Sequence, residues 1–272
     1  MCACISIALM RETYEPVLLE HRTKRRRKET GNPNLRSKLD SGISTREYFL
    51  RAIVRPTKML LFSPIVSLMS IYMAVVYGYL YLLFTTLTLV YESEYHFTSG
   101  IVGLAFLGIG IGSMAGLVIF GSISDRIVKH MAAKGEMKPE YRLPPLIPGS
   151  LFIPIGLFWY GWSVEGHVHW IMPIIGTLWV GFGMLATFMP IQTYLVDAYV
   201  QHAASAIAAN TVLRSLVGAF LPLAGPRMYA ALGLGWGNSL LAFIALALAP
   251  ISVIFYKYGE RIRKSKRFRV DF

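Results

Sequence analysis

The stretch IVGLAFLGIGIGSMAGLVIFGSI, from Ile101 to Ile123, contains no charged residue and decides the fold class of this chain. A helix of about 20 apolar residues is long enough to cross the hydrocarbon core of a bilayer, which is about 30 Å thick. Backbone amides inside lipid need hydrogen-bond partners within their own segment. This run is therefore predicted to be a membrane-spanning helix.

Five more apolar stretches accompany it along the chain. Hydrophobic residues make up 54% of the 272 residues and charged residues only 15%, and the mean hydropathy is +0.50. These values exclude an ordinary soluble domain. We predict an all-α integral membrane protein with a six-helix transmembrane domain at residues 59–256. The predicted spans are Met59–Leu89, Ile101–Ile123, Leu143–Tyr160, Trp170–Val196, Ala203–Met228 and Trp236–Tyr256.

The net charge of +12 is concentrated in three segments. Twelve of the 27 Lys and Arg residues lie between Glu20 and Lys58, five follow the second span, and seven follow Tyr256. The gaps after the first, third and fifth spans contain none. Basic loops remain on the cytoplasmic side of a membrane, so we expect a multi-pass plasma-membrane protein with both termini in the cytoplasm. The expected partner of the basic segments is anionic lipid of the bilayer, and not nucleic acid.

Three segments flank the predicted transmembrane domain. Residues 1–19 read as the remnant of a preceding membrane helix and its cytoplasmic exit. Residues 20–58 are predicted to form a basic cytoplasmic linker, helical and amphipathic around Thr45–Arg55. Residues 257–272 are predicted to form a basic cytoplasmic tail.

The second predicted span carries a row of glycines four residues apart. Gly108, Gly112 and Gly116 share one face of a helix because this spacing is close to one turn. A smooth face of small residues lets another membrane helix approach closely. The row therefore predicts a tight helix contact, either static or sliding.

Polar residues inside membrane helices are rare because lipid cannot solvate them, and they are candidates for function. Tyr77 and Tyr79 in the first span, with Gln192 and Asn210, are the predicted substrate-binding residues. Tyrosine rings suit stacking on apolar compounds, and packing between helices is the alternative role. No acidic residue lies near the middle of a predicted span, so the sequence does not locate a proton site.

Two roles are open for Asp197 and Arg214, at the fourth and fifth predicted spans. They could form an ion pair that gates the inner face. Alternatively, Arg214 bonds neighbouring carbonyls and Asp197 only caps a helix end. We retain both hypotheses.

The cytoplasmic exit of the second span, Gly121-Ser122-Ile123-Ser124-Asp125-Arg126, resembles the G-x-x-x-D-R motif of the major facilitator superfamily, in its form after the eighth helix. Gly121 would allow close helix approach, Asp125 would cap or pair, and Arg126 would reach a helix end or lipid phosphate. Other stretches are similar to fungal drug:proton antiporters of this superfamily: Arg11–Leu19, Arg25–Asn32, Tyr194–Tyr199, Ser205–Arg214, Pro222–Gly225 and Gly233–Gly237.

The resemblance covers essentially the whole chain but only helices seven to twelve of the family. It implies one half of a twelve-helix fold, built from two inverted three-helix repeats. It also implies proton-coupled efflux of small hydrophobic organic compounds, such as drugs or fungal secondary metabolites, by alternating access. Because the first half is missing, we expect an incomplete transporter, with three explanations open: a truncated gene model, a degenerate pseudogene, or a natural half that pairs with itself or with a second half-transporter. The alternative is a non-transporting membrane fragment or assembly partner.

An enzyme, a metal site and a cofactor are not expected. The chain contains no P-loop, GxSxG or HExxH pattern. His167 and His169 flank one residue, but no further Cys, His or carboxylate cluster in the sequence completes a metal site with them.

Overall fold

The computed structural model of the chain describes residues 15–32, 34–37, 45–133 and 137–264. The chain divides into two compact units, Met1–Ile53 and Val54–Phe272, each of which is considered by itself. Most of the predicted remnant helix at residues 1–19 and the last residues of the predicted tail lie outside the described ranges.

The first unit contains helix α2, Glu15–Thr30. Gly31, with a φ of 66°, follows its last turn, and the Arg27 Nε donates a hydrogen bond to the Leu35 carbonyl 2.5 Å away. Helix α3, Thr45–Phe62, begins in this unit and ends in the second. The helix predicted around Thr45–Arg55 is therefore confirmed, and it is longer than expected.

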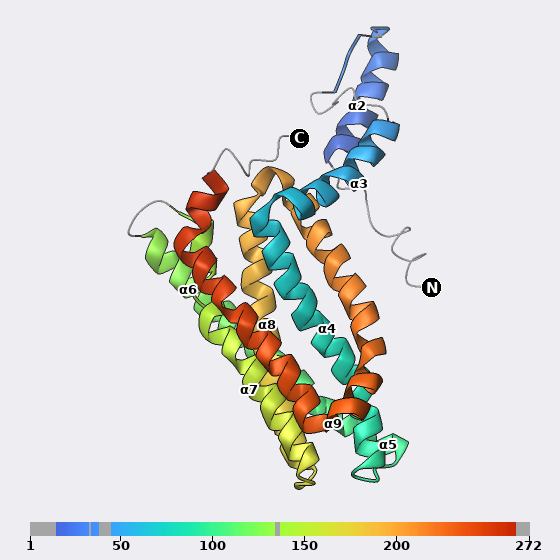
Figure 1. Cartoon of the computed structure of the whole chain (residues 1–272). Coiled ribbons are helices and arrows are strands. Elements are labelled where there is room, and N and C mark those ends of the chain that lie inside the picture. The colour runs from blue at the N-terminus through green and yellow to red at the C-terminus, as the bar shows by residue number, and fades with distance from the viewer. Residues whose placement is uncertain (1–14, 33, 38–44, 134–136, 265–272) are drawn as a thin grey trace. The chain divides into compact units, whose positions relative to one another are not determined.

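The second unit is built from long apolar helices (Figure 1). In the described residues, five helical stretches are long and apolar enough to cross a membrane. The short α5 and the 3-10 turn η1 precede α6, and the 3-10 turn η2 precedes α7. The bounds of these elements are α4 Pro64–Ser93, α5 Ser99–Val102, η1 Gly103–Phe106, α6 Leu107–Ala132, η2 Pro139–Arg142, α7 Leu146–Glu165, α8 Ile171–Ala198 and α9 Ala203–Lys264.

The first predicted span starts later than the sequence suggested. Met59 belongs to α3, and α4 begins at Pro64 after a break at Ser63, which has an extended backbone. Proline suits the first position of a helix because its fixed φ is helical and its missing N–H leaves no donor unpaired there. The Ser63 hydroxyl also hydrogen-bonds the Tyr199 hydroxyl at 2.6 Å, which joins this break to the segment between α8 and α9.

Two of the predicted spans lie within α9. The loop expected at residues 229–235 is reduced to a kink at Gly233, whose φ of 75° and ψ of 173° are not helical. In Figure 1 the orange arm of α9 runs to the lower end of the bundle, and the red arm runs back. Glycine is suited to this position because side chains disfavour positive φ. The Glu165 carboxylate accepts hydrogen bonds from the N–H groups of Leu234 and Gly235, at 3.0 and 3.1 Å, where the second arm begins.

The glycine row on α6 is confirmed as a close helix contact, and its partner is α8. A Cβ added at Gly112 would collide with the Leu178 carbonyl, and one at Gly116 would lie 2.6 Å from the Phe182 carbonyl oxygen. A Cβ at Gly108 would collide with the Ile174 carbonyl. Since Ile174, Leu178 and Phe182 are also four residues apart, the two backbones touch along matching rows.

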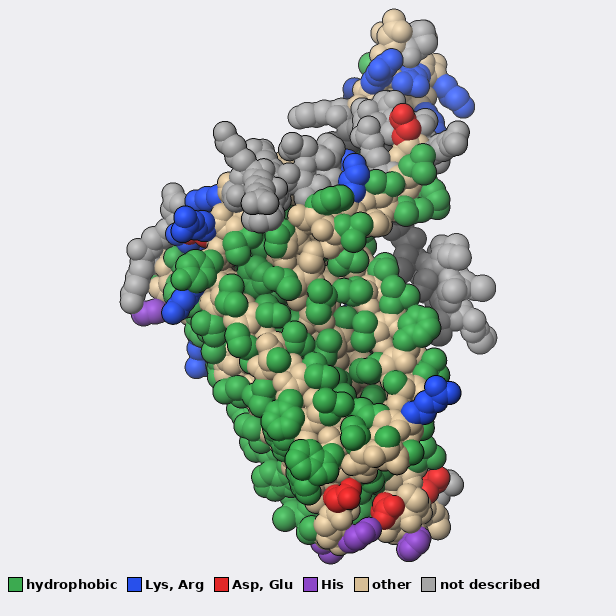
Figure 2. Space-filling view, viewed as in Figure 1, with side chains coloured by type: hydrophobic (Ala, Val, Ile, Leu, Met, Phe, Trp, Pro, Cys, Tyr) green, Lys and Arg blue, Asp and Glu red, His purple; other side chains and the backbone are tan. Residues whose placement is uncertain are grey.

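The outer faces of the second unit are apolar. On α6, Leu107, Ile111, Met114 and Val118 are each more than half exposed, away from the glycine row. Figure 2 shows hydrophobic side chains covering most of the visible face of the bundle. Acidic and His side chains gather at its lower end, and Lys and Arg lie mainly toward the upper end, with a basic side chain also low on one flank and a His at the upper left. An apolar belt between two polar ends is what a bilayer requires.

Candidate functional site

Two groups of polar side chains stand out in the second unit. The unpaired cluster consists of Tyr77, Phe188, Gln192, Asn210 and Arg214, on α4, α8 and the first arm of α9. The ion network lies at the ends of α6, η2, α8 and α9, and its members are Asp125, Lys138, Glu140, Arg142, Asp197, Glu260, Arg263 and Lys264.

Arg214 is the centre of the unpaired cluster. Its guanidinium carbon lies 4.9 Å from the centre of the Tyr77 ring and 5.3 Å from that of Phe188. The face of an aromatic ring attracts a cation, more strongly where water is excluded. Rings from α4 and α8 therefore hold a cation of α9 within the apolar part of the bundle.

Several polar atoms of this cluster have no hydrogen-bond partner among the described residues. Asn210 is fully buried, and neither its oxygen nor its nitrogen is bonded. The Gln192 Oε1 and the Arg214 Nε are also buried without a partner. Asn210 lies one turn from Arg214, and Gln192 lies one turn from Phe188, so these groups border the two rings and the cation. Buried polar groups are normally bonded, so these unbonded atoms are exceptions to that rule.

The two tyrosines predicted to bind substrate lie in different surroundings. Tyr77 belongs to the cluster, and its hydroxyl lies 3.4 Å from the Tyr81 hydroxyl. Tyr79 is only 2% exposed, and its hydroxyl donates to the Leu241 carbonyl at 2.9 Å. The structure brings Tyr77, Gln192, Asn210 and Arg214 to one region, and places Tyr79 in the contact between α4 and the second arm of α9.

Arg142 connects the ends of two membrane helices. Its Nη1 lies 3.0 Å from the Asp125 Oδ1 at the end of α6, and its Nε lies 3.0 Å from the Asp197 Oδ2 at the end of α8. The Arg142 side chain is 19% exposed and that of Asp197 29%. Solvent therefore screens the pair with Asp197 less than an ordinary surface pair, whereas the Asp125 side chain is 68% exposed and its pair with Arg142 is screened more.

The second arm of α9 joins the same network. Lys138 lies 2.6 Å from Glu260, which also pairs with Lys264 at 2.6 Å. The hydrogen bond from Lys138 to the Glu260 carboxylate raises the pKa of Lys138. Arg263 reaches the buried Glu140 at 3.4 Å. The pairs of Lys138 with Glu260 and of Arg263 with Glu140 hold the end of α9 to η2 and its preceding residue.

The proposed ion pair between Asp197 and Arg214 is wrong, because Asp197 pairs with Arg142 and Arg214 lies between two rings. In the loop motif, Asp125 pairs with Arg142, while Arg126 is exposed. A Cβ at Gly121 would meet nothing within 4 Å. Gly121 is therefore not at a close helix contact among the described residues.

Sequence reasoning missed Glu140 and Arg142 as members of a site. The signal was present in their order, because Lys138, Glu140 and Arg142 alternate in charge just before a membrane helix. The net charge of this segment indicates only a basic loop, because it does not record the order of the charges.

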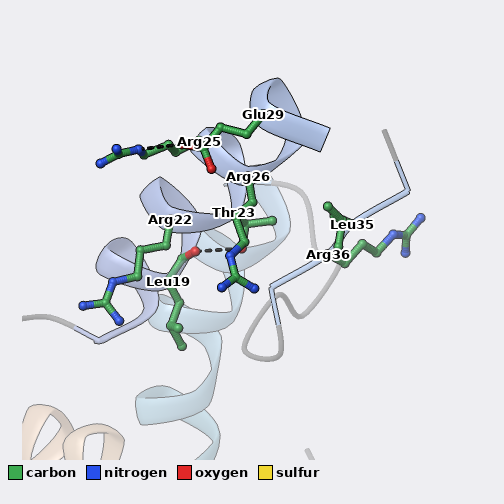
Figure 3. A pocket seen from close by; sticks show the side chains of 8 residues that line it. All are labelled: Leu19, Arg22, Thr23, Arg25, Arg26, Glu29, Leu35 and Arg36. Atoms are coloured by element: carbon green, nitrogen blue, oxygen red, sulfur yellow. Dashed lines mark hydrogen bonds and ion pairs between the residues drawn. The ribbon is translucent and has the colours of Figure 1, made fainter. Parts of the chain in front are cut away.

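The first unit contains a separate basic pocket on α2, shown in Figure 3. The pocket has a volume of about 520 Å³ and is open to solvent. Arg25 is paired with Glu29 at 2.9 Å, while the other charged lining residues are arginines. The lining residues are Leu19, Arg22, Thr23, Arg25, Arg26, Glu29, Leu35 and Arg36.

At the acidic end of the second unit, His167 lies 3.5 Å from Glu94. Within the ranges that the structure describes, no group of three or more His, Cys, Asp or Glu side chains is arranged to hold a metal ion.

Comparison with known proteins identifies relatives over nearly the whole chain. It is 60% identical to the MFS-type transporter penM of Penicillium rubens over 98% of its length, and 58% identical to the MFS transporter cpaT of Aspergillus oryzae over 97%. It is 49% identical to the efflux pump radE of Floropilus chiversii over 97%. These matches cover 53%, 53% and 50% of the relatives, so the chain spans about half the length of the curated relatives it matches.

This coverage agrees with the prediction that the chain corresponds to one half of a transporter, and these three relatives are transporters or pumps rather than enzymes. No solved structure matches the chain. Residues 2–222 match the Major Facilitator Superfamily. The apolar helices, the loop motif and this match together show that the chain belongs to the major facilitator superfamily.

Proposed function

We propose that the chain is the C-terminal half of a proton-coupled efflux transporter. Its cargo would be small hydrophobic organic compounds, such as drugs or fungal secondary metabolites, carried by alternating access. The observation that carries this proposal is the unpaired cluster, in which Arg214, Asn210 and Gln192 present unbonded polar atoms inside apolar helices. The name of one relative, the efflux pump radE, supports the outward direction, and proton coupling rests on the resemblance to drug:proton antiporters.

The proposal includes six membrane spans. Helix α9 has 62 residues, and a straight helix of that length would extend about 90 Å at about 1.5 Å per residue. Since the hydrocarbon core is about 30 Å thick, each arm of α9 on either side of Gly233 would cross separately. Helices α4, α6 and α7 would then form one three-helix repeat, and α8 with the two arms of α9 would form the inverted one.

In this proposal the site residues divide into two roles. Tyr77 would stack on the apolar part of the substrate, and Gln192 and Asn210 would hydrogen-bond its polar groups. Asp125 and Asp197, joined through Arg142, would hold the inner face closed. Gly121 and Arg126 of the loop motif would meet surfaces that the described residues do not supply. Arg214 would belong to the substrate site and not to the gate.

The proposed location is the plasma membrane, with both termini in the cytoplasm. The concentration of Lys and Arg at one end of the bundle supports this orientation (Figure 2). Basic segments on the cytoplasmic side would then contact anionic lipid headgroups.

A second candidate function is that of a non-transporting fragment or assembly partner. The observation that favours it is coverage of only about half of each relative. Exposed apolar side chains along the first arm of α9, at Val212, Leu216, Phe220 and Leu223, provide a surface that another half-transporter or a second copy could cover.

Transport by the chain in inside-out membrane vesicles distinguishes the two candidates. We expect an imposed gradient, acidic in the lumen, to drive accumulation of hydrophobic aromatic compounds, and a protonophore to abolish it. Empty vesicles are the control. If accumulation of every compound tested were independent of the proton gradient, proton-coupled efflux by this chain would be refuted and the second function favoured.

A further inference from the structure

We infer that the unpaired cluster binds an organic anion, with a carboxylate or an equivalent acidic group held by Arg214 and Asn210 and an aromatic body held by Tyr77 and Phe188. This inference rests on the proposed function of the cluster as a substrate site, and it names the chemical class of the substrate.

The charge of Arg214 is the first argument. A guanidinium remains ionised under all physiological conditions, and a charge within a membrane helix is normally paired or faces water. Among the described residues, no carboxylate forms an ion pair with Arg214, and Asp197 is engaged by Arg142. The neighbours of Arg214 are two rings, which offset only part of the desolvation of a cation. An incoming anion would complete its coordination.

The bare atoms of Asn210 are the second argument. Its side-chain nitrogen is a donor, buried without an acceptor, and it lies one helical turn from Arg214. A carboxylate has two oxygens, so one can accept from the guanidinium while the other accepts from an amide. Hydrogen bonds to a charged acceptor are stronger than neutral ones. A neutral carbonyl compound would satisfy the same donors less well and would leave the cation uncompensated.

The aromatic surroundings define the rest of the ligand. The Tyr77 and Tyr81 rings lie 5.0 Å apart, and Tyr81 continues to Phe84 at 6.3 Å. These rings form a row along α4 that begins beside Arg214. A flat apolar group attached to the acid could lie along this row, with its charge at the guanidinium. Small inorganic anions would gain nothing from the rings.

The test uses a matched pair of probes, 2-naphthoate and the neutral 2-naphthamide. The full chain is placed in nanodiscs of neutral phosphatidylcholine, and binding is measured by equilibrium dialysis with empty nanodiscs subtracted. We expect the chain to bind naphthoate at least about tenfold more tightly than naphthamide. The Arg214→Gln variant should lose this preference, and Arg214→Lys should retain part of it, because it keeps the charge but not the planar fork.

Arg227→Gln is the matched control, because Arg227 lies on the same arm of α9 and is exposed. It should preserve the preference for naphthoate. Unchanged naphthoate binding in Arg214→Gln would overturn the inference. It would also be overturned if the unmodified chain bound both probes equally or bound neither of them. Thermal unfolding of each variant separates loss of binding from loss of fold.

Parallel vesicle transport distinguishes this inference from the proposed function. Preferential binding of naphthoate without gradient-driven accumulation of any compound would uphold the anion site and refute efflux. Gradient-driven accumulation that is equal for both probes and indifferent to Arg214→Gln would uphold efflux and refute the anion site.

Discussion

The ion network and the unpaired cluster each contain a buried or half-buried arginine, but the two arginines have opposite surroundings. In the network, Arg142 contacts two carboxylates at 3.0 Å each. In the cluster, Arg214 contacts two rings and no described carboxylate. Paired charges at the membrane surface connect helices, and their interactions are complete within the chain. Unpaired polar groups in an apolar surrounding are incomplete, and their interactions are available to a ligand. In our proposal, the network residues stabilise the fold and the cluster residues bind the ligand.

The largest expected effect comes from disrupting the helix contact between α6 and α8. Gly112→Leu should abolish folded, monodisperse protein, because its side chain would meet the Leu178 backbone, which cannot move aside. Overpacking typically costs about 1–3 kcal/mol, and a clash with backbone belongs at or above the upper end of that range. Gly110→Leu is the matched control, since a Cβ there meets nothing within 4 Å. Size-exclusion profiles and unfolding temperatures in detergent measure both. Equal profiles for the two variants would contradict the described contact between α6 and α8.

The next effect tests the network through a double-mutant cycle of Arg142→Ala and Asp197→Ala. The coupling should be about 1–2 kcal/mol, because the pair is partly buried and charge-assisted. Equilibrium unfolding in denaturing detergent gives the four stabilities. Arg126→Ala, at the same end of the bundle but exposed, should change stability by less than about 0.5 kcal/mol. Additive single changes would show that the bridge does not connect the helices.

The smallest expected effect is a change in stability of opposite sign when each of two buried asparagines is replaced by leucine. Asn210 and Asn238 are both fully buried. Asn238 is bonded to the Leu234 carbonyl at 2.8 Å and to the Tyr229 hydroxyl at 3.1 Å. Asn210→Leu should stabilise the protein by about 1 kcal/mol because it removes unbonded buried groups, while Asn238→Leu should destabilise it by a similar amount, about 1 kcal/mol. Thermal unfolding of the two variants gives the comparison. A loss of stability in both would mean that Asn210 is already satisfied.

The sequence predicts the helical membrane class from apolar runs such as Ile101–Ile123, and it predicts the contact of the glycine row. Both follow from composition and helical spacing, which are local properties. The start of the first span at Pro64 was missed because Met59–Phe62 is as apolar as the first turns of α4. At Gly233 the sequence predicted a longer loop. The kink is short because the Glu165 carboxylate accepts hydrogen bonds from the N–H groups of Leu234 and Gly235, and Glu165 comes from another helix, which the local sequence does not reveal.

The candidate site was predictable in its members but less so in its pairings. Arg214, Asn210 and Gln192 are identified by polarity within apolar runs. Periodicity cannot state which residue faces another helix, so Tyr79 was grouped with Tyr77 although only Tyr77 lies beside Arg214. The partner of Asp197 was missed because Arg142 is distant in sequence. Such pairings depend on how helix ends meet in space.

The thermal shift produced by 2-naphthoate tests the central claim most directly. A ligand that binds only the folded state raises the unfolding temperature. We predict that Arg142→Gln lowers the starting temperature by a few degrees and keeps the naphthoate shift, because it weakens the network alone. Arg214→Gln should lose the shift without lowering the starting temperature, because it removes a cation that no described carboxylate compensates. A naphthoate shift that survives in Arg214→Gln, or that disappears in Arg142→Gln, would contradict the division between paired and unpaired charges.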